Sequence, residues 1–78
     1  MNLLNAKKHS VYIIKEVSTS DGGLKTRFFH LGFTPGNSLT LKRKAPLFGD
    51  PLLYEVGDSQ IALTKNEAKL IEVEKLEA

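Results

Sequence analysis

The chain has 78 residues, of which 41% are hydrophobic and 26% charged. A chain of this length has room for one compact core, which excludes a second domain and argues against a deep active-site cleft. Cysteine is absent, and disulfides, thiolate zinc sites, iron–sulfur clusters and a cysteine nucleophile are therefore excluded. The net charge of +2 is the sum of +6 over residues 1–45 (eight basic, two acidic) and −4 over residues 46–78 (three basic, seven acidic).

The first predicted element is a β-strand over Val11–Val17, a segment rich in β-branched and aromatic residues. A period of two places Val11, Ile13 and Val17 on one side of the strand.

A short helix is predicted after the turn-rich segment 18–23. Leu24, Phe28 and Leu31 recur at the i, i+4, i+7 spacing of a helical stripe, and Arg27 and Phe29 lie off this stripe, where we expect them to be exposed. Gly32 is expected to end the helix, because glycine accepts the left-handed conformation that other residues resist.

Residues 34–37 read Thr-Pro-Gly-Asn, a sequence typical of a type II turn. The segment 38–45 then alternates as a strand, with Leu39, Leu41 and Ala45 facing inward and Thr40, Lys42 and Lys44 facing solvent. Arg43 is expected to point away from the two lysines, so the basic triplet would not form one patch.

Two further strands are predicted over 52–56 and 59–63, joined by Gly57-Asp58 as a type II′ hairpin. Thr64 and Glu67 have the spacing of a capping box, which predicts a single helical turn through Ala68. A last strand follows over 71–76. The predicted fold is mostly β, a small five-stranded barrel with a short helical insertion after the first strand and a single-turn helix before the last.

Three segments in this order resemble the FeoA family: L-G-F-T-P-G at 31–36, A-P-L-F-G-D-P-L at 45–52, and I-A-L at 61–63 followed by Glu67-Ala68 and I-E-V at 71–73. The match runs from about residue 11 to residue 73, within a single FeoA-like domain over 1–78. The resemblance implies an SH3-like barrel in a small cytoplasmic protein of bacterial ferrous iron uptake. It also implies contact with the cytosolic G-domain region of an FeoB-like membrane transporter, and no catalytic activity.

An alternative function comes from the same resemblance, because related domains lie at the C-terminus of iron-dependent repressors. In that case the chain would be a transition-metal-binding or metal-responsive adaptor. The basic first half and the acidic second half of the chain favour oriented docking on a protein. We expect the partner-binding residues to be Arg27, Phe29, Arg43, Pro46, Leu47, Phe48 and Asp50.

The loop from Ala45 to Leu53 has two readings. Two prolines restrict its backbone, so Leu47 and Phe48 would dock on a partner with little loss of conformational entropy. The same side chains would equally well fold back to cap one end of the barrel. Both readings stay open.

His9 and His30 are candidate metal ligands, since imidazole binds divalent transition metals. They lie on different predicted elements without a second ligand at metal-binding spacing, so we expect no metal site and no cofactor. Weak contact with Fe²⁺ or Zn²⁺ through histidine and surface carboxylates stays open.

Several other functions are not expected. The lysines of 42–44 are explained by a solvated edge strand, so no nucleic-acid partner is expected. The sequence contains no catalytic triad, carboxylate pair or phosphate-binding glycine loop, which argues against an enzyme. No apolar run reaches the ~18 residues that span a bilayer, and residues 1–8 do not resemble a signal peptide, so we expect a cytoplasmic protein without direct membrane insertion. Edge strands in so small a barrel can pair between chains, which would give a homo-oligomer.

Overall fold

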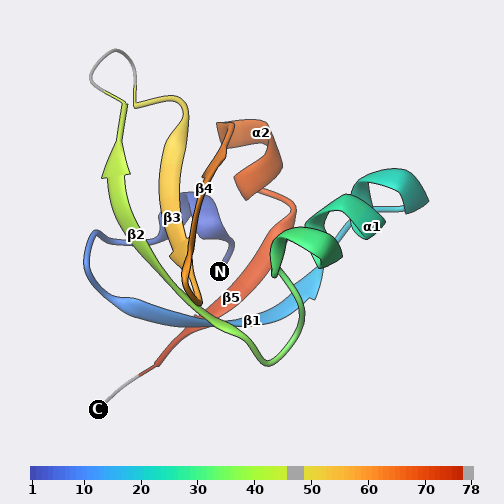
Figure 1. Ribbon diagram of the computed structural model, residues 1–78, viewed down its shortest axis with the longest axis horizontal. Coiled ribbons are helices and arrows are strands. Elements are labelled where there is room, and N and C mark those ends of the chain that lie inside the picture. The colour runs from blue at the N-terminus through green and yellow to red at the C-terminus, as the bar shows by residue number, and fades with distance from the viewer. Residues whose placement is uncertain (46–48, 77–78) are drawn as a thin grey trace.

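The computed structural model describes residues 1–45 and 49–76, which form a bent five-stranded antiparallel sheet with short helical segments (Figure 1). The strands are β1 (Val11–Val17), β2 (Ser38–Lys44), β3 (Leu52–Val56), β4 (Ser59–Leu63) and β5 (Ile71–Lys75), and the helical segments are η1 (Leu3–Asn5), α1 (Gly22–Leu31) and α2 (Lys65–Ala68). The strand order is β4-β3-β2-β1-β5. The mostly β, SH3-like architecture is confirmed, with α1 after the first strand and α2 before the last.

One continuous hydrophobic core fills the inside of the bent sheet. Every strand contributes to it, as do the three helical segments; its buried members are Leu3, Ala6, Tyr12, Ile14, Val17, Phe28, Phe33, Leu39, Leu41, Leu52, Tyr54, Val56, Leu63, Ala68, Ile71 and Val73. Three aromatic rings pack edge-to-face at ring-centroid distances of 6.0 Å for Phe28 and Phe33 and 6.5 Å for Phe33 and Tyr54. Such pairs stabilise a core beyond the burial of their area, and here they tie α1 to β3.

The predicted turns are confirmed. Gly32 ends α1 with φ +99°, which favours glycine, and a Cβ there would lie 3.1 Å from Cγ1 of Val56, which leaves little room for a side chain. The Asn37 N–H donates to the Thr34 carbonyl at 3.1 Å across the type II turn. Gly57 has φ +60° in the two-residue turn between β3 and β4, as a type II′ hairpin requires.

The predicted grouping of Val11, Ile13 and Val17 on one side of β1 is wrong. The core-facing residues are Tyr12, Ile14 and Val17, while Val11 is 39% exposed and Ile13 is half-buried. The pairing with β5 shifts register between Ile14 and Glu16. An extra residue at such a bulge reverses the side to which later residues point, so 12, 14 and 17 all face inward.

The predicted alternation of β2 also fails beyond Leu41. Leu39 and Leu41 are buried as expected, but the register with β3 shifts between Leu41 and Arg43. After this bulge Arg43 and Lys44 are both exposed, Lys42 is only half-buried in place of being solvated, and Ala45 is half-buried instead of inward. Arg43 is therefore not turned away from solvent, whereas Lys44 is exposed as predicted.

The N-terminal segment is an integral part of the fold, which the sequence did not indicate. The Val73 N–H donates to the Met1 carbonyl at 2.8 Å, and Leu3 is completely buried. Both buried tyrosines hold the segment: the Lys7 N–H donates to the Tyr12 hydroxyl at 2.8 Å, and the Tyr54 hydroxyl donates to the Leu3 carbonyl at 3.3 Å. The segment η1 also packs against α2 and β5 (Figure 1).

Truncating Leu3 tests whether the N-terminal segment stabilises the core. We expect Leu3→Ala to lower the free energy of unfolding by about 2–5 kcal/mol, the range for a buried leucine that leaves a cavity. Leu4, only partly buried beside it, is the matched control, and Leu4→Ala should cost clearly less. Urea denaturation measures both, and equal losses would contradict the assignment.

Candidate functional site

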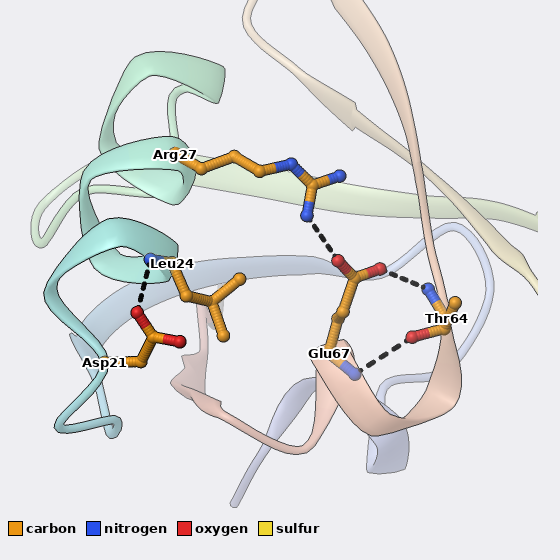
Figure 2. A network of polar contacts seen from close by, with 5 residues as sticks. All are labelled: Asp21, Leu24, Arg27, Thr64 and Glu67. Atoms are coloured by element: carbon orange, nitrogen blue, oxygen red, sulfur yellow. Dashed lines mark hydrogen bonds and ion pairs between the residues drawn. The ribbon is translucent and has the colours of Figure 1, made fainter.

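A polar clamp joins α1 to α2 and fixes the position of α1 on the barrel (Figure 2). Glu67 occupies the third position of α2, where its Oε1 accepts from the Thr64 N–H at 2.9 Å while Thr64 Oγ1 accepts from the Glu67 N–H at 3.2 Å. The other carboxylate oxygen of Glu67 forms an ion pair with Arg27, which lies on α1, 40 residues earlier in the chain. The confirmed capping box thus also anchors the helical insertion.

The Glu67 carboxyl is held in its charged form. Its pKa is lowered by the hydrogen bond from the Thr64 backbone and by Arg27. The phenol of Tyr54 shifts the other way, since burial raises its pKa well above the ordinary value. Each shift has a structural cause, namely helix capping for Glu67 and core packing for Tyr54.

Phe29 forms the apolar centre of an exposed surface on α1. It stands off the buried stripe of the helix, as predicted, with 63% of its surface exposed. Beside it is a hollow of about 240 Å³, here called the α1 hollow, whose apolar lining is Val17, Phe29, Phe33 and Pro35. Glu16 and Lys25 also line the hollow, so it combines an apolar floor with charges of both signs.

Arg43 belongs to a different hollow, on β2, β3 and β4. This strand hollow has a volume of about 440 Å³ and is lined by Arg43, Lys44, Ala45, Pro51, Leu52, Leu53 and Ala62. Register explains the grouping, because Arg43 pairs with Leu53 and Leu53 with Ala62 on neighbouring strands. The combination of apolar side chains with two cations suits an acidic protein surface.

Of the remaining predicted site residues, Asp50 is described by the structure and is not part of either lining. The Asp50 carboxylate accepts from the Lys65 N–H at 3.1 Å and so supports the start of α2. Pro46, Leu47 and Phe48 lie outside the described residues, and the choice between anchor and cap for this loop remains a prediction. Phe29 and Arg43 therefore line two separate surfaces, while Arg27 is engaged in the clamp.

The two histidines do not come together in a ligand set. His9 precedes β1 and has φ +67°, with its N–H donating to the Leu41 carbonyl at 3.0 Å. His30 lies on α1, where its ring meets Phe29 edge-to-face at 6.1 Å. Within residues 1–45 and 49–76, no three His, Cys, Asp or Glu side chains are grouped to hold a metal ion. In the same part of the chain, no helix is long and apolar enough to cross a membrane.

A family model described as the FeoA domain matches residues 1–75, almost the whole chain. The chain belongs to the FeoA family. None of the curated proteins compared with it matches.

Solved structures extend this assignment. FeoA of Stenotrophomonas maltophilia, complexed with zinc and described as an SH3 domain protein, is 30% identical with a TM-score of 0.83 over 95% of this chain and 89% of its own. Iron(II) transport protein A of Clostridium thermocellum is 37% identical with a TM-score of 0.90 over 97% of this chain, which spans 46% of that one. A manganese-dependent transcriptional repressor, 16% identical with a TM-score of 0.84, shares the fold over 97% of this chain and 41% of its own.

Sequence reasoning missed the contacts that build these surfaces. Glu67 was recognised as a cap, but nothing in the sequence links it to Arg27. Val17 was placed only on one side of the first strand and no role was predicted for Phe33, whereas both line the α1 hollow with Phe29. The one sequence signal that pointed to these surfaces was the apolar stripe of α1, because Phe29 lies off this stripe.

Replacing Glu67 tests the clamp through the pH dependence of stability. A carboxyl with a lowered folded-state pKa stabilises the fold above its ordinary value of 4.5, and this contribution disappears as pH falls through the folded-state pKa. We therefore expect Glu67→Gln to be less stable than the parent at pH 7 and the difference to shrink towards pH 3. Thermal unfolding at both values measures it. Glu74→Gln, in the exposed pair with Lys15, serves as the control, and an equal effect there would contradict the clamp.

Proposed function

We propose that this FeoA-family protein is a non-catalytic, cytoplasmic accessory and regulatory protein of bacterial ferrous iron uptake. It acts by binding the cytosolic G-domain region of an FeoB-like transporter. Membership of the FeoA family supports the role in iron transport. The zinc-bound relative has been described as a candidate activating factor of bacterial ferrous iron transport, which supports an auxiliary role.

The observation that carries the proposal is the exposed phenyl ring of Phe29 on a rigidly held helix. Phe28 anchors α1 in the core, and the Arg27–Glu67 pair fixes it to α2. An aromatic side chain presented on an ordered element loses little conformational entropy when it docks. The α1 hollow beside the ring offers room for one apolar side chain of the partner.

The strand hollow provides a second contact, with Arg43 and Lys44 beside its apolar lining. The segment 46–48 follows Ala45 in the sequence, and its Leu47 and Phe48 side chains are proposed as further anchors. Binding at either surface would bias the conformation or the nucleotide cycle of the transporter only if it favoured one state over another. The proposal therefore requires affinity that depends on the nucleotide bound to the transporter.

Phe29→Ala tests the docking surface. We expect binding to the cytosolic region of the transporter to weaken by about tenfold or more, because buried aromatic anchors dominate interface energies. The melting temperature should hardly change, since Phe29 is already exposed in the free protein. Leu76, 53% exposed on another part of the chain, is the matched control, and Leu76→Ala should bind as the parent does. Calorimetric titration in each nucleotide state measures the affinities, and complete absence of binding by the parent would refute the proposal.

A second candidate function is a transition-metal-binding or metal-responsive adaptor. The zinc in the Stenotrophomonas maltophilia relative favours it, and the likeness of fold to a manganese-dependent repressor agrees with it. The metal ligands would then come from His9 or His30 together with carboxylates. Among the described residues, however, no three His, Cys, Asp or Glu side chains are grouped to hold a metal ion.

Anaerobic titration with Fe²⁺ separates the two functions. If docking on a transporter is the function, we expect no binding tighter than micromolar. Tighter binding that disappears in His9→Ala or His30→Ala would favour the metal-responsive adaptor instead. Zn²⁺ titrated in parallel shows whether any binding is selective.

A further inference from the structure

The two edges of the sheet differ in what covers them. The outer edge of β5 is covered by the N-terminal segment, through the hydrogen bond from the Val73 N–H to the Met1 carbonyl and the bridge between Asn2 and Glu72. On the other edge, β4 pairs with β3, and no other described segment makes a backbone hydrogen bond to it. Within the described residues, β4 is therefore the open edge of the sheet.

The open edge also lacks the features by which proteins usually discourage pairing between chains. Edge strands are commonly protected by lysine, proline or a bulge. The sequence of β4 is Ser-Gln-Ile-Ala-Leu, without charge, proline or glycine, and its register with β3 is unbroken from Ser59 to Leu63. The covered strand β5, in contrast, carries Glu72, Glu74 and Lys75.

The turn before β4 decides which of its backbone groups face outward. In a two-residue hairpin the flanking residues, Val56 and Ser59, form a hydrogen-bonded pair. Antiparallel pairing alternates, so Ser59, Ile61 and Leu63 bond to β3. The N–H and C=O groups of Gln60 and Ala62 then point away from the sheet, and both residues are exposed.

We infer that β4 is a self-association site, at which the β4 strands of two copies of this chain pair antiparallel about a twofold axis at Ile61. This arrangement places Gln60 opposite Ala62 of the second copy, so the outward backbone groups of both strands form four hydrogen bonds. Ile61 lies opposite Ile61 of the second copy in a non-hydrogen-bonded pair, where side chains approach most closely. The result is a continuous sheet through both copies.

Charge at the two ends of β4 favours a second copy over another occupant. Asp58 directly precedes the strand, and Lys65 follows it after Thr64. Antiparallel pairing brings the acidic end of one strand beside the basic end of the other, and the twofold axis repeats this contact. Because β4 itself carries no charged residue, pairing two copies of it places no like charges opposite each other. The strand and its flanking residues are therefore complementary to a second copy of themselves.

The interface is small, and the dimer should be weak and reversible. Interfaces below about 1,200 Å² typically belong to transient complexes, so we expect self-association between about 50 µM and 1 mM protein. Phe29 is not part of the pairing. Ala62 lines the strand hollow, whereas Asp58 lines neither hollow. Asp58→Lys therefore tests self-association apart from transporter binding, and Phe29→Ala tests transporter binding apart from self-association.

Sedimentation velocity and amide hydrogen exchange of the full chain across this range test the inference. We expect the weight-average sedimentation coefficient to rise with concentration. The Gln60 and Ala62 amides should become protected only at high concentration, whereas those of Ser59, Ile61 and Leu63 are protected throughout. A constant sedimentation coefficient with unprotected Gln60 and Ala62 amides would overturn the proposal.

Two sets of variants make the test specific. Ala62→Pro removes an outward N–H that β3 does not use and should stay monomeric, while Ala62→Ser keeps the donor and should dimerise as the parent does. Because Ala62→Pro has a risk of disturbing the strand, Asp58→Lys provides an independent variant, expected to weaken the dimer about threefold or more. Adding Lys65→Glu to Asp58→Lys should restore it. A dimer that persists unchanged in both Ala62→Pro and Asp58→Lys uses another surface and refutes the inference.

Discussion

The edge-to-face packing of Phe28, Phe33 and Tyr54 is the interaction on which the rest of the molecule depends. A chain of 78 residues has few positions for large buried side chains, and these three rings occupy the place where α1, the segment after it and β3 meet. The Tyr54 hydroxyl then donates to the Leu3 carbonyl, which brings the N-terminal segment to the same point. Elements far apart in sequence thus share one centre, and disturbing it would loosen all of them together.

The function proposed here needs surfaces held in a fixed geometry more than it needs chemistry. The pKa values of Tyr54 and Glu67 are displaced from their ordinary values, and core packing and helix capping explain these two shifts. Glu67 serves two helices, because one carboxylate oxygen caps α2 while the other binds Arg27 on α1. The helix that presents Phe29 is consequently held at both its buried face and its polar side. Preorganisation of this kind lowers the cost of binding a partner.

Three surfaces remain available on this framework: the α1 hollow, the strand hollow and the open edge of β4. They differ in chemistry, since the first is aromatic, the second combines apolar side chains with Arg43 and Lys44, and the third offers unpaired backbone groups. The strand hollow includes Ala62 of β4, so it lies next to the open edge. The proposed function requires contact surfaces of this kind and no catalytic cleft.

The sequence by itself determined the elements whose signals are local. Gly32 and the hairpin turn at Gly57 could be read directly, because backbone conformation there depends on the residue in place, and the capping box is complete within four residues. The position of Phe29 off the apolar stripe of α1 likewise predicted that its side chain is exposed. Only tertiary structure decided the bulges in β1 and β2, the burial of Leu3, and the pairing of Arg27 with a residue 40 positions away. These features arise from contacts between distant segments, and no short stretch of sequence contains both partners.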